Sequence, residues 1–450
     1  MNLEEALEIV QTVVEQGSLS KVQEIVFRQC WEKQSYMEIA VKNGYEVGYI
    51  RDVGCKLWQA LSRAFGKKVT KNNFQGVLKH QYVAMRAAEQ SNKKLPHAHD
   101  VSNPNTQVNT SKQYQDWGDA VDVSVFYGRY RELTTLKQWI LQDRCRLISL
   151  LGMGGIGKTS CTVKIAQDVQ DEFKFVIWRS LRSAPPLKDL LTELILFFCD
   201  WQQVDLPGNL DQLISRVMGY LRQNRCLLVL DNCESILRPG ERSGCYRTGY
   251  EGYGELLRRI ADERHQSCLL LTSREKPSDL TPKEGKTLPV RSLQLTGLSQ
   301  LEAQQILKDK GIVDLDNQSK QLTGYYNGNP LALKIAATTI SNLFGGDVSK
   351  FLDQGIVVFG DIWELLDQQF NRLSSLEQQV MYCLASHRKW TTLAQLREDC
   401  FATLCERELL EALESLHGRS LIEVHLASYT QPTVIMDYMN VRGMAKLIHH

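Results

Sequence analysis

Residues 152–159 read Gly-Met-Gly-Gly-Ile-Gly-Lys-Thr, and this octet matches the phosphate-binding pattern G-x-x-x-x-G-K-[ST] at every fixed position. The apolar run 145–151 predicts a buried strand before it, and residues 160–169 predict a helix after it. In such a unit the glycines let successive backbone N–H groups face phosphate oxygens, and the helix N-terminus adds its dipole. The octet therefore predicts a nucleotide phosphate loop rather than a glycine-rich turn that binds nothing.

Two side chains of the loop carry the expected chemistry. Lys158 is predicted to reach the β- and γ-phosphates, and the Thr159 hydroxyl is predicted to ligate Mg²⁺. The other predicted phosphate-binding positions belong to the loop and the first helical turn: Gly152, Gly154, Gly155, Ile156, Gly157 and Ser160.

Two further apolar runs end in polar residues. Residues 226–231 end in Asp231, which is the expected second Mg²⁺ ligand; the alternative is an aspartate that caps a strand in a turn. Residues 268–274 end in Thr272, Ser273 and Arg274, and Arg274 is expected to contact a γ-phosphate rather than only solvent. Because parallel strands end at a common edge, these residues are predicted to meet the loop there. Lys158, Asp231 and Arg274 are thus the candidate catalytic residues.

Strand and helix patterns alternate through this part of the chain. Strands are predicted at 145–151, 174–180, 226–231, 267–272 and 291–295, with helices at 157–169, 187–199, 210–223, 252–263 and 299–309. Alternation of this kind predicts an α/β fold with a parallel sheet between helices. Residues 238–254 read as a long surface loop, and a short hairpin is predicted near 421–436.

Bulk composition excludes several classes of protein. The 450 residues carry a net charge of +1, so no global field favours nucleic acid or a membrane, and the acidic N-terminus is unlike a signal peptide. No apolar run approaches the roughly 20 residues of a membrane span. The twelve cysteines include no C-x-x-C pair, so structural zinc is not expected, and Cys383, like Cys145, Cys226 and Cys268, reads as a buried thiol. We expect a soluble, cytoplasmic, reduced protein.

Taken in order, these motifs resemble the NB-ARC group of the STAND class of P-loop NTPases. Two further segments add to the resemblance: residues 126–129 (Phe-Tyr-Gly-Arg) and residues 328–333 (Gly-Asn-Pro-Leu-Ala-Leu). The resemblance implies binding of ADP or ATP with Mg²⁺. It also implies that the adenine is framed by Tyr127, Gly128, Arg129 and Pro330.

Residue composition and the resemblance together divide the chain. A helical, helix-turn-helix-like domain spans 1–88 and a flexible linker spans 89–120. The P-loop domain spans 121–297, a helical subdomain spans 298–355, and a winged-helix-like subdomain spans 356–450.

Two departures from the family pattern bear on activity. Asn232 follows Asp231 where the family often has a second acid, and an amide is no base; Glu234 lies two residues further on. At most slow ATP hydrolysis is therefore expected. The family's Met-His-Asp motif has its nearest match in Met436-Asp437-Tyr438, which lacks the histidine, and His425 is a possible substitute.

The N-terminal block resembles the small helix-turn-helix-like domain of bacterial, cyanobacterial-type regulators. Tyr36 to Ala40 would form a first helix, residues 43–45 the turn, and a second helix would carry Arg51 and Lys56. Residues 41–86 hold nine basic and two acidic residues. DNA contact is one interpretation, but a helical adaptor with solvated lysines is favoured. Trp58 and Leu61 are predicted to lie in the core.

The leading hypothesis is a nucleotide-dependent signalling switch, closed with ADP and opening for self-association on exchange to ATP. The alternatives are a turnover ATPase and a DNA-binding regulator that the NTPase controls. Bacterial relatives usually continue into WD-type or tetratricopeptide repeats that sense the signal, whereas this sequence ends at His450. A separate sensor or effector protein, or a truncated relative, is therefore expected, and no membrane partner is.

Overall fold

In the computed structural model, contacts within the chain group its residues into two compact units. The first comprises Met1–Asn109 and Ile195–Asp205, and the second comprises Thr110–Leu194 and Leu206–His450. The structure describes residues 113–200, 205–241, 244–312, 317–355 and 358–448. In the N-terminal part it describes residues 3–13, 19–32, 34, 36–45, 49–50, 53–54, 57–58, 60–62, 69, 74–75 and 77–78.

The N-terminal unit contains α1 (Leu3–Val13), α2 (Lys21–Trp31) and α3 (Tyr36–Asn43). Ser20 and Gln23 form a capping box that starts α2. Trp58 and Leu61 are buried in the core with Phe27 and Phe74, which confirms their prediction as core residues. The proposed DNA-contacting residues Arg51 and Lys56 lie outside the described residues.

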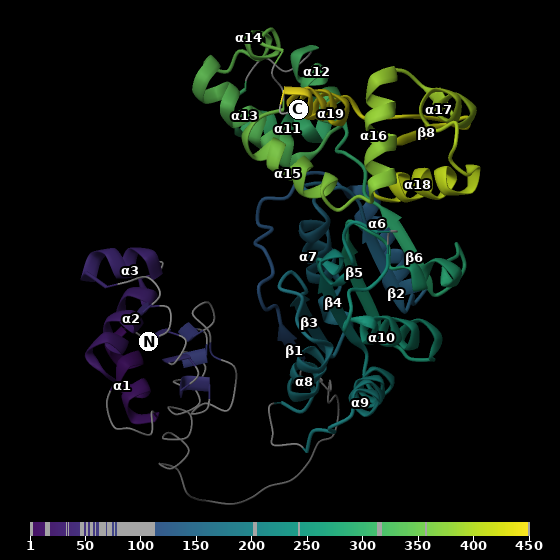
Figure 1. Cartoon of the computed structure of the whole chain (residues 1–450). Coiled ribbons are helices and arrows are strands. Elements are labelled where there is room, and N and C mark those ends of the chain that lie inside the picture. Colours follow the sequence, from purple (N-terminus) through teal and green to yellow (C-terminus); the bar gives the residue numbers. More distant parts are fainter. Residues whose placement is uncertain are drawn as a thin grey trace, which may run out of the picture. The chain divides into compact units, whose positions relative to one another are not determined.

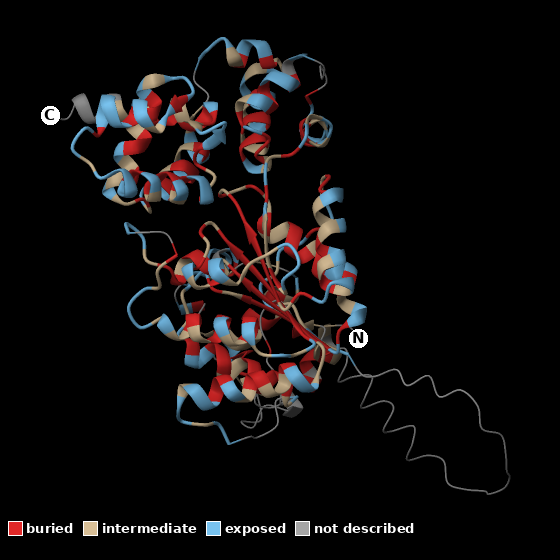
Figure 2. Cartoon of the chain, turned by 90° about the vertical axis from the view of Figure 1, so that its right-hand side faces the viewer, coloured by how far each residue is buried: buried red, intermediate tan, exposed pale blue. Residues whose placement is uncertain are grey.

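Six parallel strands form the central sheet of the second unit (Figure 1). In spatial order they are β1 (Tyr114–Asp116), β3 (Phe175–Ser180), β4 (Cys226–Asp231), β5 (Cys268–Ser273), β2 (Leu147–Leu151) and β6 (Val290–Gln294). β2, β4 and β5 are buried at every position, which Figure 2 shows as red strands between helices with exposed outer faces. This confirms the predicted α/β fold.

The edge strand β1 lies inside the segment predicted to be a flexible linker. It pairs in parallel with β3, and the ring of Tyr114 stacks on Phe175 with centroids 5.1 Å apart. The Arg179 guanidinium, in turn, lies 2.8 Å from Asp116. The linker prediction is therefore wrong over Tyr114–Asp116, because pairing with a distant strand orders a segment whose own composition is polar.

Helices cover both sides of the sheet. They are α6 (Tyr130–Lys137), α7 (Lys158–Val169), α8 (Leu187–Phe198), α9 (Leu210–Gln223) and α10 (Glu251–Asp262), with a π-helical turn at Gln138–Gln142. Short 3₁₀ turns lie at Gln170–Glu172, Cys233–Ile236 and Ser278–Lys283. The predicted helices agree with these bounds to within a residue.

A helical subdomain follows the sheet and contains α11 (Gln300–Asp309), α12 (Asn317–Tyr325), α13 (Pro330–Phe344) and α14 (Val348–Leu352). Local sequence explains the bounds of α13. The Asn329 side chain accepts from the first free N–H groups, Pro330 occupies the first turn, and Gly345 ends the helix at a φ of 60°.

The last subdomain has a winged-helix pattern of helices and short strands. Its helices are α15 (Gly360–Phe370), α16 (Ser375–His387), α17 (Leu393–Cys400), α18 (Glu406–Gly418) and α19 (Thr433–Ile448). Antiparallel β7 (Thr391–Thr392), β9 (Ser428–Thr430) and β8 (Glu423–His425) pair in that order, and β8 and β9 form a hairpin within the predicted range.

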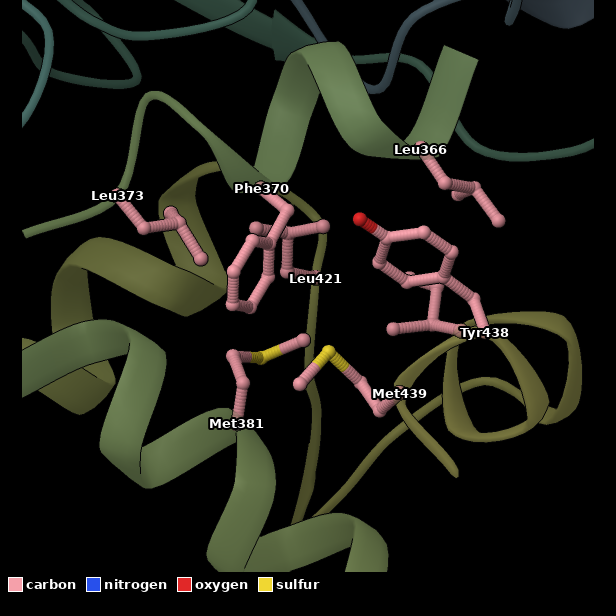
Figure 3. A pocket seen from close by; sticks show the side chains of 8 residues that line it. Leu366, Phe370, Leu373, Met381, Leu421, Tyr438 and Met439 are labelled. Carbon is pink, nitrogen blue, oxygen red and sulfur yellow. The ribbon is translucent and has the colours of Figure 1, made fainter. Parts of the chain in front are cut away.

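A small cavity lies in the core of this last subdomain. Figure 3 shows Phe370, Met381 and Met439 around it, with Tyr438 opposite. Its volume is about 10 Å³ and its walls are almost entirely apolar. Since a space of this size holds at most one water and offers it few partners, we interpret it as a packing defect rather than a ligand site.

Among the described residues, no helix combines the length and the apolar character that crossing a bilayer requires.

Candidate functional site

The phosphate loop adopts a backbone that its glycines make possible. Gly152, Gly155 and Gly157 have φ values of 148°, 74° and 97°, in a region that other residues rarely enter. A Cβ on Gly152 would also lie 2.8 Å from the Leu295 carbonyl oxygen. Gly157 is the N-cap of α7, so the loop leads directly into a helix N-terminus. This is the predicted strand–loop–helix arrangement.

Lys158 is buried and curls back over the loop. Its ammonium group donates to the carbonyl oxygens of Gly152 and Met153, at 2.8 and 3.0 Å. Burial lowers the pKa of this amine to about 8; Glu234 and Asp231 oppose the shift, and Arg274 adds to it. The positive charge is thus held where phosphate oxygens would be. Burial of this charge is unfavourable, and a bound anion would offset the unfavourable free energy.

Thr159 and Asp231 come together as predicted. The Thr159 hydroxyl lies 2.9 Å from Asp231 Oδ1, at the C-terminal end of β4, and Thr272 of β5 donates to the same carboxylate. Burial raises the pKa of Asp231, although both hydroxyl donors act in the opposite direction. A hydroxyl and a buried carboxylate in contact fit the ligands that Mg²⁺ takes beside a phosphate loop.

Arg274 lies beside the loop and is paired. Its Nε is 3.2 Å from Glu234 Oε1, and its backbone N–H donates to the other oxygen of Glu234. A Cβ on Gly154 would lie 3.3 Å from the guanidinium carbon, so Arg274 directly faces the loop. Asn232 has a φ of 63° and begins the turn that contains Glu234. Arg274, the predicted phosphate sensor, is therefore paired with the Glu234 carboxylate in this structure.

The predicted adenine-framing residues have other contacts. The Arg129 guanidinium is buried, donates to the Ile156 carbonyl and pairs with Glu132. A Cβ on Gly128 would collide with Glu302, whose carboxylate accepts from the Arg129 N–H. Arg129 thus supports the phosphate loop through its hydrogen bond to Ile156.

Tyr127 belongs to the same segment and contacts the helical subdomain. Its hydroxyl donates to Asp309 at 2.7 Å, and burial together with Asp309 raises its pKa to about 12. The Lys334 ammonium lies 5.4 Å from the centre of its ring.

Asn329, which the sequence analysis did not single out, contacts the phosphate loop directly. Its Nδ2 donates to the Gly154 carbonyl at 2.9 Å, while its Oδ1 caps α13. The next residue but one, Leu331, donates its N–H to the Gly155 carbonyl. An asparagine directly before a helix-starting proline is a capping signal, and only the fold shows that it also binds the loop.

The winged-helix subdomain adds residues that the sequence reasoning did not identify. Gln369 of α15 is buried, accepts from the Gly154 N–H at 3.4 Å and donates to the Arg419 carbonyl. Glu275, just after β5, lies 2.5 Å from Arg372 and 2.9 Å from Arg419. These contacts connect the loops at the ends of β2 and β5 to the last subdomain.

A cavity of about 370 Å³ lies beside the loop. Its walls come from the loop, the end of β6, the helical subdomain and the winged-helix subdomain: Met153, Ile156, Gln294, Leu295, Thr296, Gly297, Tyr326, Asn327, Asn329, His417, Ser420, Ile422, Glu423, Val424, Pro432 and Val434. Its volume falls in the range of small-molecule sites. Of the predicted nucleotide-binding residues only Ile156 lines it; Tyr127 and Pro330 do not.

The proposed match to the Met-His-Asp motif lies within α19 instead of beside the loop. Tyr438 is buried in the subdomain core and donates to Asp367 of α15 at 2.9 Å. His425 is exposed on β8, where its ring lies 5.9 Å from that of Trp390. His417, at the end of α18, is the histidine that lines the cavity.

Comparison with known proteins agrees with this geometry. Residues 129–235 match the NB-ARC domain family, and residues 1–81 match the N-terminal helix-turn-helix of vWA-MoxR associated proteins.

Two relatives match by sequence. The chain is 50% identical over 345 residues to a WD repeat-containing protein of Nostoc sp., a match that covers 74% of this chain and 27% of that protein. It is 25% identical to a nucleotide-binding leucine-rich repeat-like protein of Hyaloscypha variabilis, over 48% of this chain and 22% of that protein. The chain thus spans about a quarter of the length of these relatives.

Among solved structures, a STAND protein of Pyrococcus horikoshii with a tetratricopeptide repeat sensor matches at a TM-score of 0.39 and 17% identity. The match covers 72% of this chain and 44% of that one. The two domain matches, together with the phosphate loop on its parallel sheet, show that the chain contains an NB-ARC-type P-loop domain and an N-terminal helix-turn-helix domain.

Proposed function

We propose that the chain is an adenine-nucleotide-controlled signalling switch, closed with ADP and opened for self-association by exchange to ATP. Gly154 of the phosphate loop carries the proposal. Its carbonyl accepts from Asn329 of the helical subdomain, and its N–H donates to Gln369 of the winged-helix subdomain. The loop expected to hold the phosphates therefore contacts both subdomains, so a change in phosphate occupancy acts on both contacts.

A nucleotide can shift such an equilibrium only through its different affinity for the two forms. Arg274 supplies that difference in our proposal, because its present partner is the Glu234 carboxylate and a γ-phosphate would compete for it. The Glu234 carbonyl accepts from Arg372, which also pairs with Glu275. A change of partner at Arg274 is thus transmitted toward the winged-helix subdomain through Glu234 and Arg372.

The remaining site residues take the roles that their geometry supports. Lys158 would neutralise the β-phosphate, and Thr159 with Asp231 would hold Mg²⁺. Gly152, Gly154, Gly155, Ile156, Gly157 and Ser160 would contribute the surrounding backbone. Tyr127, Gly128, Arg129 and Pro330 remain the proposed frame of the adenine.

Slow hydrolysis is part of this proposal. Asn232 is not a base, and both oxygens of Glu234 are engaged by Arg274. A turnover ATPase is the alternative, and a rate well above ~1 s⁻¹ would favour it, since ordinary enzymes work at roughly 1–10³ s⁻¹.

Control of DNA binding is the second candidate function. The helix-turn-helix match over residues 1–81 favours it, as do the nine basic residues between 41 and 86. Binding of a DNA duplex by the full chain should then weaken steeply as salt increases, because phosphate contacts release counterions. Since the Nostoc relative contains WD repeats, we further propose that a repeat array of that kind delivers the signal.

The nucleotide carried by the purified protein tests the switch. The full chain is denatured, and the released nucleotide is identified and quantified by ion-exchange chromatography. Near-equimolar ADP is expected, with little or none in a Lys158→Ala variant whose circular dichroism matches the wild type. Protein that carries no nucleotide and binds neither ADP nor ATP, or a variant that retains ADP equally well, would contradict the site assignment.

A further inference from the structure

A cluster of metal-ligating side chains lies in the winged-helix subdomain, apart from the phosphate loop. Cys383 and His387 are four residues apart on α16, and Cys400 ends α17. Their ligand atoms all lie within 4.8 Å of one another. The two sulfurs are joined as a disulfide in this structure. Cys383 is buried, as predicted, but it is not a free thiol in this structure, because the fold brings a second cysteine to it from 17 residues away.

We propose that in the reduced protein Cys383, His387 and Cys400 bind a zinc ion. Residues four apart on a helix project from the same face, so Cys383 and His387 present a sulfur and a ring nitrogen to one point. Two thiolates and one imidazole are ligands that Zn²⁺ prefers, and three protein ligands already define most of a tetrahedral site.

The surroundings of His387 favour a metal over a disulfide alone. Its Nδ1 lies 3.2 Å from the Thr391 hydroxyl, and its Nε2 lies 3.3 Å from Asp399 Oδ2. When a histidine binds zinc through one ring nitrogen, its other ring nitrogen is usually hydrogen-bonded to a partner of this kind. That hydrogen bond fixes the tautomer and orients the ring. A disulfide between Cys383 and Cys400 requires neither a histidine nor an orienting hydroxyl beside it.

Asp399 can complete the coordination. Nitrogen and oxygen ligands at about 2.0–2.2 Å from one tetrahedral zinc lie about 3.3 Å apart, which is the separation of His387 Nε2 and Asp399 Oδ2. Asp399 directly precedes Cys400, and its side chain is 53% exposed, so there is room for its carboxylate to turn toward the two sulfurs while it stays close to His387. Otherwise a water molecule takes the fourth position.

Burial and position indicate what the site does. Cys383 is buried while Cys400 is exposed. An ion could therefore reach the site from solvent at Cys400 and be held by the buried sulfur of Cys383. A bound ion would connect the end of α16 to the end of α17 across β7. Metal binding of this kind contributes directly to folding stability.

Metal content of the full chain tests this inference. The protein is purified with a non-thiol reductant and without a chelator, and its zinc content is measured by elemental mass spectrometry. About one zinc per chain is expected, with loss in Cys400→Ser and at least about tenfold weaker binding in His387→Gln. The matched control is Cys405→Ser, which removes an exposed free cysteine five residues beyond Cys400 and should retain zinc fully.

Cobalt provides a readout that is independent of purification history. Co²⁺ added to reduced, metal-free wild type or Cys405→Ser should give thiolate charge-transfer and intense visible bands, which Cys400→Ser should lack. Reduced wild-type protein without zinc and without cobalt bands would overturn the proposal, as would equal zinc in Cys400→Ser. Circular dichroism of the same samples shows whether each variant has folded, and their nucleotide content tests the switch separately.

Discussion

The Glu275 carboxylate and the Arg419 guanidinium form an ion pair with 2.9 Å between Oε1 and Nη1, and only 1% and 2% of the two side chains are exposed. Glu275 follows β5 of the nucleotide-binding domain, and Arg419 follows α18 of the winged-helix subdomain. Arg372 contacts the same carboxylate. Because charges so deeply buried are tolerated only when they are paired, docking of the winged-helix subdomain depends strongly on Glu275.

The Glu275→Gln substitution removes the negative charge between two buried arginines. Breaking a buried pair costs about 3–5 kcal/mol, so we expect the closed form to loosen and ADP to dissociate faster, with more self-association. Stopped-flow release of a fluorescent ADP analogue measures the rate. Glu255→Gln is the control, because its pair with Arg258 is at the surface and should matter little. Wild-type release from Glu275→Gln would contradict the docking role.

The Arg274→Ala substitution should distinguish the two nucleotides. A hydrogen bond to a charged group contributes about 1.5–3 kcal/mol, so the affinity for ATP should fall by roughly 10- to 100-fold. The affinity for ADP should change much less, because only a γ-phosphate competes with Glu234 for Arg274. Calorimetric titration measures both, with Arg238→Ala as an exposed control. Equal losses for the two nucleotides would rule out Arg274 as a γ-phosphate sensor.

Asn329 has a matched counterpart elsewhere in the chain. Both Asn329 and Asn209 cap helices through their side chains, but only Asn329 also contacts Gly154. Asn329→Ala and Asn209→Ala should each cost about 1 kcal/mol of stability through the lost cap. Nucleotide retention should decrease only in Asn329→Ala, as measured by chromatography of released nucleotide. Equal nucleotide retention in both variants would show that the contact between Asn329 and Gly154 does not contribute to nucleotide binding.

Nucleotide affinity should depend on pH through Lys158. Since burial lowers its pKa to about 8, affinity should hold below that value and decrease as pH rises through it, with proton uptake on binding. Lys158→Arg keeps its charge and should show a flat profile. Calorimetry in buffers of different ionisation enthalpy counts the protons, and a wild-type profile that is flat up to pH 9 would refute this account.

The same shift affects stability in the opposite direction. Between about 8 and the ordinary lysine value of 10.5, the unfolded chain binds a proton that the nucleotide-free native protein does not. The contribution of Lys158 to stability should therefore increase as pH rises through this window.

Local patterns were enough to predict the core of the site. The octet at 152–159, the strand that precedes it, the strand that ends in Asp231 and the strand that Arg274 follows each carry their signal within a few residues. Parallel strands place those ends together. The Thr159–Asp231 contact agrees with that rule, because the phosphate loop follows β2 and Asp231 ends β4.

Contacts between distant segments could not be predicted in this way. Gln369 lies 215 residues from Gly154, and nothing in the sequence around it differs from an ordinary helix. β1 could not be predicted because it is only three residues long, has polar neighbours in the sequence and is ordered by its pairing with β3. Cys383 and Cys400 lack a compact spacing motif, so only the packing of α16 against α17 brings them together.

The most direct test of the switch is sedimentation velocity of the full chain with saturating ADP and with a non-hydrolysable ATP analogue. The account predicts a slowly sedimenting, non-associated species with ADP and larger assemblies with the ATP analogue. It also predicts that Glu275→Gln shifts toward the larger assemblies even with ADP. Identical sedimentation with the two nucleotides, both shown to be bound, would contradict the claim that the phosphate loop controls docking of the subdomains.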